Sequence, residues 1–366
     1  MLITMETLII GGGVIGLSIA RELKKRGADK VTVLERGRVG REASWAAAGI
    51  LAPQVEADTA DKFFRLCFES NRLYPALAGE LLDETGIDVE LNKNGTLYLA
   101  FDDADEKELD HRFQWQTAAG LGLERLDRLQ VKALEPDMSD NVTGGLYFPD
   151  DGQVENRKLV DALAASAKLL GVDIREGLEV KSILSGQGAV KGVETTQGHF
   201  AADRVVITTG AWASHIELAE ARLPVEVKPI RGQMICYRPQ EVAIRHVIYS
   251  RRGYVVPRAD GRLLAGATAE DVGFDSGVTD EALRLLQDVA VEIAPQLGGS
   301  KVTDHWAGLR PYSVSGSPFI GPVKKAEGLF AAVGHFRNGI LLTPITARMI
   351  ADAVLASNNA AFKVNS

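Results

Sequence analysis

Three glycines near the start of the chain have the GxGxxG spacing with which dinucleotide-binding proteins hold a pyrophosphate. They are Gly11, Gly13 and Gly16 in TLIIGGGVIGLSIARELKKRG. Gly11 would make a tight turn, Gly13 would let the backbone approach the phosphates, and Gly16 would let a helix pack closely on a strand. A helix that begins at about Val14 would direct free N–H groups and a partial positive charge at the phosphates.

The elements that must position these glycines are also indicated by the sequence. Residues 7–10 predict a short buried strand, the expected helix ends at Gly27, and residues 31–34 predict a second buried strand. Glu35 follows, where a carboxylate can bind ribose hydroxyls. This unit does not distinguish FAD from NAD(P) as the cofactor. Glu35 disfavours NADP, because its charge would repel a 2′-phosphate.

Residues 36–53 are too rich in small side chains for an ordinary amphipathic helix. In their sequence, RGRVGREASWAAAGILAP, residues 46–49 would let a flat ring and its linker pass, and Ser44 could bond a phosphate. The alternative interpretation is a site where small residues allow helices to pack closely.

Two later positions also suggest contact with a cofactor. Gly210 follows a predicted buried strand at 205–208, which indicates either a second close approach of backbone to cofactor or a plain turn at a strand end. Arg337 and Asn338 stand between glycines in GHFRNGILL, just before an apolar run. A full charge in such a setting requires an anionic partner, because burying an unpaired charge is costly.

Composition argues against several classes of protein. At 366 residues the chain is longer than single cores usually are, so two domains are expected. The formal net charge of -8 disfavours nucleic acid and anionic membranes as partners. Cys67 and Cys236 stand in apolar sequence without metal-ligand spacing, so we expect buried free thiols, no metal site and a cytoplasmic protein. Residues 1–20 are apolar, but no Lys or Arg precedes them, and we expect neither a signal peptide nor a membrane span.

The remaining pattern indicates two kinds of sheet. A helix is predicted over 58–85, a three-stranded meander over 182–204, a helix near 280–295, and a strand at 328–333 before a closing helix. Long strands over 225–300 predict an antiparallel sheet in a separate lobe.

The expected fold class is therefore α/β, a Rossmann-like dinucleotide-binding domain with an inserted antiparallel-sheet (α+β) substrate domain. We assign residues 1–88, 148–224 and 302–366 to the first domain, and residues 89–147 and 225–301 to the second.

The chain resembles, nearly end to end, the FAD-dependent amino-acid and amine oxidases of the D-amino-acid oxidase superfamily. The resemblance rests on GGGVIGLSIARELKKRG, SWAAAGILAP, VVITTGAW, PIRGQM, WAGLRPYSVSGSPFIG and GHFRNGILL. WAGLRP and GHFRNGI are its most specific motifs, and they imply FAD rather than NAD. Within the superfamily the chain looks most like the bacterial enzymes associated with making the thiazole ring of thiamine. Members with covalent flavin carry a cysteine near the C-terminal loops, and none follows Cys236 here, which implies non-covalent FAD.

For the cofactor, the resemblance implies contacts along its whole length. Glu35 and Arg36 would lie near the adenosine ribose, and Val180 beside adenine. The other residues it implies lie in the pyrophosphate turn, along the phosphates and isoalloxazine, and around the flavin: Val14, Ile15, Ala43, Ser44, Ala48, Gly49, Ile50, His335, Phe336, Arg337, Asn338, Gly339, Ile340 and Leu341. His335 would pack beside the ring, with proton transfer as the alternative role.

For the substrate, the resemblance implies Tyr254, Arg310 and Arg337 as catalytic and substrate-binding residues. Arg310 would grip a carboxylate with two parallel N–H donors, Arg337 would support that charge, and Tyr254 would donate a phenolic hydrogen bond. A structural salt bridge is the alternative for either arginine. Ala269 is small enough to leave room for substrates larger than glycine.

The implied activity is oxidative deamination of glycine and other small amino acids or amines, such as sarcosine and small D-amino acids. A hydride would pass from Cα to the flavin, the imine would hydrolyse to a 2-oxo acid and ammonia, and O₂ would be reduced to H₂O₂. The alternatives are a flavin dehydrogenase that uses a quinone, a flavoprotein binding module, and an NAD-dependent dehydrogenase. The expected partners are the amino acid, O₂ and further copies of the chain in a tetramer or dimer.

Overall fold

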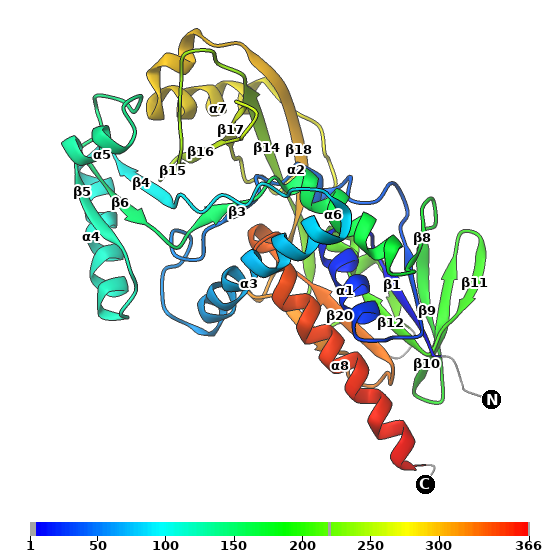
Figure 1. Cartoon of the computed structure of the whole chain (residues 1–366). Helices are drawn as coiled ribbons and strands as arrows, with labels where there is room; N and C mark the ends of the chain where they lie inside the picture. Colours follow the sequence, from blue (N-terminus) through cyan, green and yellow to red (C-terminus); the bar gives the residue numbers. More distant parts are fainter. Residues whose placement is uncertain (1–4, 219–220, 365–366) are drawn as a thin grey trace.

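The computed structural model describes residues 5–218 and 221–364. A six-stranded sheet lies in the half of the molecule in which the described chain begins (Figure 1). In spatial order its strands are β19 (Phe319–Pro322), β20 (Leu329–Val333), β12 (Arg204–Ile207), β1 (Glu6–Ile10), β2 (Lys30–Leu34) and β8 (Asp173–Arg175). All neighbouring pairs are parallel except β19–β20. The strands predicted at 7–10, 31–34, 205–208 and 328–333 are therefore confirmed to within a residue or two.

Helix α1 (Val14–Lys25) follows β1 at once because glycines permit the sharp turn between them. Gly11 has a φ of +107°, and a Cβ there would lie 2.5 Å from the carbonyl oxygen of Thr208. A Cβ at Gly16 would lie 2.0 Å from the carbonyl oxygen of Gly11. Only glycine at these positions lets α1 pack this closely on the sheet.

The six-stranded sheet is the middle of three layers and is buried on both faces. Ile9 packs with helix α1, with α6 (Asn156–Leu169) and with α8 (Thr343–Val364) on one face. Its neighbours Leu8 and Ile10 point to the other face, since successive strand residues alternate. There they pack against β9 (Val180–Gly186) and β10 (Ala189–Thr195) of a small sheet completed by β11 (Gly198–Ala201) and β13 (Glu217–Leu218). This small sheet contains the predicted meander.

A second large sheet has eight strands and forms the other half of the molecule (Figure 1). In spatial order they are β18 (Val302–Ser313), β14 (Val227–Tyr237), β17 (Leu263–Gly266), β16 (Gly253–Pro257), β15 (Val247–Ser250), β4 (Thr96–Ala100), β6 (Gly144–Phe148) and β5 (Glu124–Asp127). The prediction of an antiparallel sheet needs one correction, because β15 and β4 run parallel. This pair joins the two chain segments that build the sheet, and no hairpin connects it.

Helices α7 (Asp280–Ile293), α4 (Asp103–Ala118) and α5 (Arg128–Leu134) pack against this sheet or at its edge, and the short helix η2 (Pro295–Gly299) follows α7. The remaining elements connect the two halves. They are α2 (Ala43–Ala46), the paired strands β3 (Ile50–Leu51) and β7 (Gly152–Gln153), α3 (Lys62–Thr85), η1 (Gly210–His215) and η3 (Phe336–Asn338). The helix predicted over 58–85 begins at Lys62, where the Asp61 side chain accepts a hydrogen bond from the backbone N–H of Phe64 at 2.7 Å.

The division of the chain into domains stays a prediction. Its boundary between residues 301 and 302 falls at the start of β18, although the partner of β18 along its whole length is β14, from the other assigned segment. Residues 1–4, 219–220 and 365–366 of the assigned ranges lie outside the described residues.

Within the described ranges, no helix combines the length and the apolar character needed to cross a bilayer. Cys67 and Cys236 are both buried free thiols, as predicted.

Candidate functional site

A cavity of about 750 Å³ is lined both by the carboxyl ends of β1 and β2 and by strands β14, β16 and β18. Of the residues predicted for the site, Gly16 and Leu341 do not line it, since Gly16 packs α1 on the turn and Leu341 is buried in the core between helices. The others all line it: Gly11, Gly13, Val14, Ile15, Glu35, Arg36, Ala43, Ser44, Ala48, Gly49, Ile50, Val180, Gly210, Tyr254, Ala269, Arg310, His335, Phe336, Arg337, Asn338, Gly339 and Ile340.

The turn before α1 forms a cradle suited to a pyrophosphate. Gly13 has extended backbone and no side chain caps the helix at this residue. A Cβ at Gly13 would lie 3.1 Å from the hydroxyl oxygen of Ser44, which itself accepts a hydrogen bond from the backbone N–H of Val14 at 3.1 Å. The amino end of α1 is thus open to the cavity and close to a hydroxyl, a combination that favours an anion.

Glu35 lies at the end of the cavity next to this cradle. Its side chain is buried, and its two oxygens accept hydrogen bonds from the backbone N–H groups of Gly12 at 2.7 Å and Gly37 at 2.8 Å. Each carboxylate oxygen keeps a further lone pair for a hydroxyl group. The neighbouring Arg36 guanidinium lies 3.6 Å from the ring centroid of Trp212, which also lines the cavity. Trp212 was missed from the sequence, although it stands in the quoted VVITTGAW motif.

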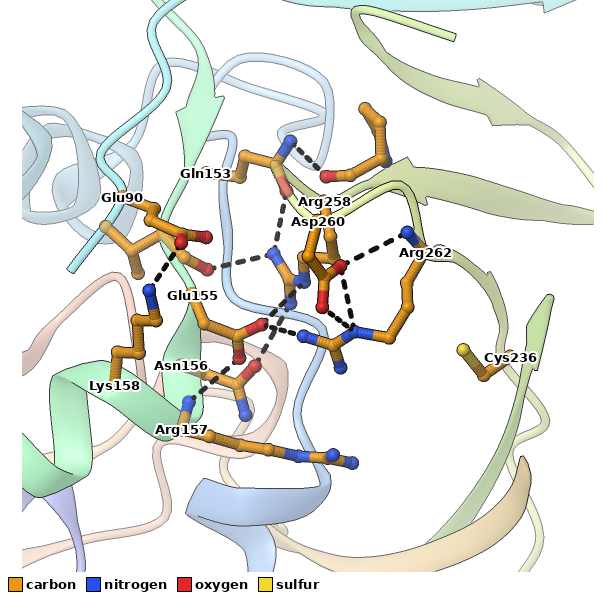
Figure 2. A network of polar contacts seen from close by, with 12 residues as sticks. Glu90, Gln153, Glu155, Asn156, Arg157, Lys158, Cys236, Arg258, Asp260 and Arg262 are labelled. Atoms are coloured by element: carbon orange, nitrogen blue, oxygen red, sulfur yellow. Dashed lines mark hydrogen bonds and ion pairs between the residues drawn. The ribbon is translucent and has the colours of Figure 1, made fainter. Parts of the chain in front are cut away.

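The wall of small residues predicted at 46–49 is present and is held from behind by a polar network (Figure 2). Arg258 donates a hydrogen bond through Nη2 to the carbonyl oxygen of Ala48 at 2.8 Å. Asn156 donates through Nδ2 to the carbonyl oxygens of Ser44 at 2.9 Å and Trp45 at 3.0 Å. The wall therefore keeps its shape without large side chains of its own.

His335 is buried at the turn before α8. Its Nε2 lies 3.1 Å from the hydroxyl oxygen of Thr346, one turn into that helix. Burial lowers the pKa of His335 to about 4, so the imidazole is neutral at physiological pH. A neutral, buried imidazole fits the predicted packing role better than proton transfer. The next residue, Phe336, has a φ of +48°, a strained value for a bulky side chain at a cavity wall.

Arg310 reaches into the cavity from β18. Its Nη1 donates a hydrogen bond to the carbonyl oxygen of Thr268 at 2.8 Å, which leaves the other guanidinium N–H donors for a ligand. The guanidinium lies over Gly232 of β14, where a Cβ would come within 2.1 Å of Nη1. Burial raises the pKa of Tyr254, an effect that the charge of Arg310 partly opposes. Tyr254 is therefore a neutral hydrogen-bond donor beside a guanidinium.

Arg337 faces two residues that the sequence analysis missed, Glu56 and Tyr249. Its Nε lies 3.7 Å from Oε2 of Glu56, and the Tyr249 hydroxyl donates to Oε1 of Glu56 at 2.9 Å. The charge of Glu56 raises the pKa of Arg337. The Tyr249 and Tyr254 rings lie 5.3 Å apart, because these residues are directly opposite in the β15–β16 hairpin. The hairpin spacing in HVIYSRRGYVVP was the signal that could have identified Tyr249.

This arrangement can bind an elongated dinucleotide and a small carboxylate in the same cavity. The cradle, Glu35 and the wall of small residues suit the dinucleotide, and Arg310 with Tyr254 suits the carboxylate. The guanidinium of Arg310, which keeps N–H donors for a ligand, favours an anion at the carboxylate end of the cavity.

Comparisons with known proteins agree with this geometry. The chain matches the family model described as "FAD dependent oxidoreductase" over residues 6–353. It is 37% identical over 348 residues to a glycine oxidase of Pseudomonas aeruginosa, covering 95% of this chain and 94% of that protein. It is 39% identical over 358 residues to the bifunctional protein ThiO/ThiG of Synechocystis sp., of whose length it spans 52%. Among solved structures, glycine oxidase from Geobacillus kaustophilus superposes with a TM-score of 0.91 and 35% identity, covering 96% of this chain and 95% of that one.

Proposed function

The chain belongs to the family of FAD-dependent oxidoreductases, and from this premise we propose that it is an oxidase of glycine and other small amino acids or amines. The observation that carries the proposal is the guanidinium of Arg310, which lies over Gly232 with free N–H donors inside the cavity that holds the dinucleotide cradle. The similarity to glycine oxidases over nearly the whole chain supports the same substrate class.

The residues that would hold FAD fit its chemistry. Gly11, Gly13 and the amino end of α1 would take the pyrophosphate, and Glu35 would accept hydrogen bonds from the ribose. Residues 43–50 and 335–340 would enclose the flavin. When bound, FAD would accept a hydride equivalent from the substrate and pass its electrons to O₂. Both cysteines are buried thiols and neither lines the cavity, which supports non-covalent binding.

Arg310 and Tyr254 would bind the carboxylate of the substrate. A guanidinium and a phenol pair with both carboxylate oxygens, and this orients the bond between Cα and its hydrogen relative to the flavin. Arg337 would add positive charge at the rim, with Glu56 offsetting part of it. Ala269 lines the cavity without filling it, so side chains larger than hydrogen can enter.

The turn around residues 339–342 would keep the flavin and this carboxylate site in fixed relation. The carbonyl oxygen of Gly339 accepts from the Thr343 hydroxyl at 2.9 Å, and that of Leu341 accepts from the Ser70 hydroxyl at 2.6 Å. The Tyr74 hydroxyl donates to the carbonyl oxygen of Ile340. His335 is neutral, so it adds no charge beside the ring.

Three further features belong to the proposal. O₂ serves as the electron acceptor, and the peroxide formed leaves with the imine product. The enzyme supplies the oxidised intermediate from which the thiazole ring of thiamine is made, in line with its similarity to ThiO/ThiG. It works in the cytoplasm, in keeping with its two buried free thiols. It forms a homo-oligomer, either a dimer or a tetramer.

The proposal is tested with the purified protein in its FAD-bound form. Anaerobic glycine, sarcosine or D-alanine should bleach the flavin absorbance, and air should restore it with formation of H₂O₂. Slow recovery in air but fast recovery with a quinone would indicate a dehydrogenase instead. The Arg310→Ala variant should keep the flavin spectrum but raise KM by about 100-fold, because a charge-assisted bidentate contact contributes about 3 kcal/mol. Arg284→Ala, on an exposed position of α7, is the control and should behave as wild type. An unchanged KM for Arg310→Ala would remove the carboxylate assignment.

A further inference from the structure

Arg258 is a buried arginine that lies outside the cavity and touches its wall from behind. It follows Pro257, the last residue of β16, and 7% of its surface is exposed. Nη1 donates hydrogen bonds to Oε1 of Gln153 at 2.8 Å and to the carbonyl oxygen of Val154 at 3.1 Å. Nη2 donates to the carbonyl oxygen of Ala48 at 2.8 Å and to Oδ1 of Asn156 at 3.1 Å. One planar guanidinium thus joins two segments that are distant in sequence.

Asn156 extends this connection along the cavity wall. While its oxygen accepts from Arg258, its amide group donates to the carbonyl oxygens of Ser44 and Trp45. Figure 2 shows Arg258 between Gln153, Glu155 and Asn156, with Arg262 bonded to the same carboxylate of Glu155. Arg258 therefore holds one end of the small-residue segment directly, at Ala48, and the other end through Asn156, at Ser44 and Trp45.

Gly49 shows how closely this segment is held. Its φ is +69°, and a Cβ there would lie 2.0 Å from the carbonyl oxygen of Val154 and 3.3 Å from Nη2 of Arg258. The carbonyl oxygen of Gly49 accepts a hydrogen bond from the backbone N–H of Val154 at 2.9 Å. Gly49 therefore packs directly against the backbone of Val154, and the hydrogen bond from Arg258 to Ala48 holds the wall in this place.

Strand β16 links this network to the substrate end of the cavity. Tyr254 stands on the same strand, within one short stretch of extended backbone from Arg258. We propose that Arg258 is a positioning residue that fixes the cavity wall at residues 44–49 relative to strand β16, so that the flavin and Tyr254 keep one mutual geometry. This role rests on the proposed function where it concerns the substrate, but not where it concerns binding of FAD.

The charge on Arg258 is balanced without involving the cavity. Its Nε lies 3.4 Å from Oε2 of Glu155, and the same oxygen accepts from Nη2 of Arg262 at 2.8 Å. Arg262 also bonds the carboxylate of Asp260 at 2.8 Å. The side-chain hydrogen bonds of Arg262 thus go to Glu155 and Asp260, whereas Arg258 bonds Ala48 of the wall and residues 153–156. Arg262 is therefore a suitable control for Arg258, because it bonds the same carboxylate of Glu155 but does not bond Ala48 in the described hydrogen bonds.

The network is separate from Arg310, the guanidinium that would bind the carboxylate. Arg310 is held by Thr268 and lies over Gly232, and neither residue bonds to Arg258 or Asn156 in the described hydrogen bonds. Loss of Arg258 should therefore leave substrate binding intact but shift the flavin relative to the bound substrate. The result expected is a fall in the rate of flavin reduction with little change in KM.

The test compares Arg258→Met and Arg258→Lys with Arg262→Gln. For each variant one measures the Kd of FAD for the apoprotein, the visible absorbance and circular dichroism of the bound flavin, and, at saturating FAD, the rate of anaerobic flavin reduction. Arg258→Met should raise the Kd of FAD at least about tenfold, alter the flavin bands and slow reduction by about 100-fold, as expected for a misplacement of about 1 Å. Its KM should stay within about threefold of wild type.

Arg258→Lys should recover only part of each property, because an ammonium keeps the charge but cannot bond two segments with a planar fork. Arg262→Gln should match wild type in all three measurements. Wild-type FAD affinity, flavin bands and reduction rate in Arg258→Lys would overturn the proposal, even where Arg258→Met yields no folded protein. Equal losses in Arg262→Gln would overturn it too. If no amino acid bleaches the wild-type flavin, the proposed function fails, while FAD affinity and the flavin bands still decide the role of Arg258.

Discussion

Replacing Gly232 by alanine should displace the guanidinium of Arg310 without unfolding the protein. The added Cβ would lie 2.1 Å from Nη1 and 2.3 Å from both Cζ and Nη2 of Arg310. Nonbonded heavy atoms pack at roughly 3.5 Å, so the guanidinium must shift by about 1.4 Å. It is the far end of a flexible side chain, and it can make this shift by changing its side-chain torsions.

The expected cost falls on substrate binding rather than on stability. A misplacement of about 1 Å can lower activity by about 100-fold, which corresponds to about 2.7 kcal/mol. Gly232 pairs with Gly308 in the ladder of β14 and β18, and alanine is compatible with a strand, so the free energy of unfolding should change by less than about 1 kcal/mol. We therefore expect a large rise in KM at nearly constant Tm.

The assay measures KM for glycine, the Kd of acetate from its perturbation of the flavin spectrum, and Tm. Acetate carries the carboxylate without the amine, so its Kd reports on the carboxylate site that contains Arg310. Gly299→Ala is the matched control, because a Cβ at Gly299 would have no heavy atom within 4 Å. Wild-type KM and acetate affinity in Gly232→Ala would show that the added Cβ does not displace the guanidinium of Arg310. Equal losses in the control would show that the effect does not come from the collision.

Two further predictions concern titratable side chains that line the cavity. Burial lowers the pKa of His335 to about 4, whereas an unfolded chain has a histidine pKa near 6.5. Between these pH values the unfolded state binds more protons than the folded state. The free energy of unfolding should therefore fall as the pH falls from about 6.5 to about 4. His335→Gln should remove about 1.4 kcal/mol per pH unit of this slope, measured by denaturant unfolding at saturating FAD; equal slopes would contradict the burial argument. Glu56→Gln should bind acetate roughly threefold to tenfold more tightly, because the charge of Arg337 is no longer offset at 3.7 Å. Asp58→Asn should have a smaller effect, because this side chain is 85% exposed and acts on Arg337 only through charge. Unchanged or weaker binding in Glu56→Gln would count against the pairing.

Much of the fold was predictable because its signals are local. The unit of β1, α1 and β2 depends on a glycine spacing and on apolar periodicity within one short stretch. The strand before Gly210 and the closing helix follow from similar patterns. The parallel pair of β15 and β4 was not predictable in this way, because its residues are far apart in sequence and no hairpin sets their register. For the same reason the predicted boundary at residue 302 separates β18 from its partner β14.

The same difference between local signals and contacts of distant segments applies to the candidate site. The glycines of the cradle and the place of Glu35 at its edge were predictable, because neighbouring residues in the chain impose that geometry. The contacts of Arg310 over Gly232, of Glu56 and Tyr249 with Arg337, and of Arg258 with Ala48 became visible only in the folded chain. These contacts join segments from different strands and loops. Their distances depend on sheet register and on the packing of the two halves, neither of which is encoded in any short stretch of residues.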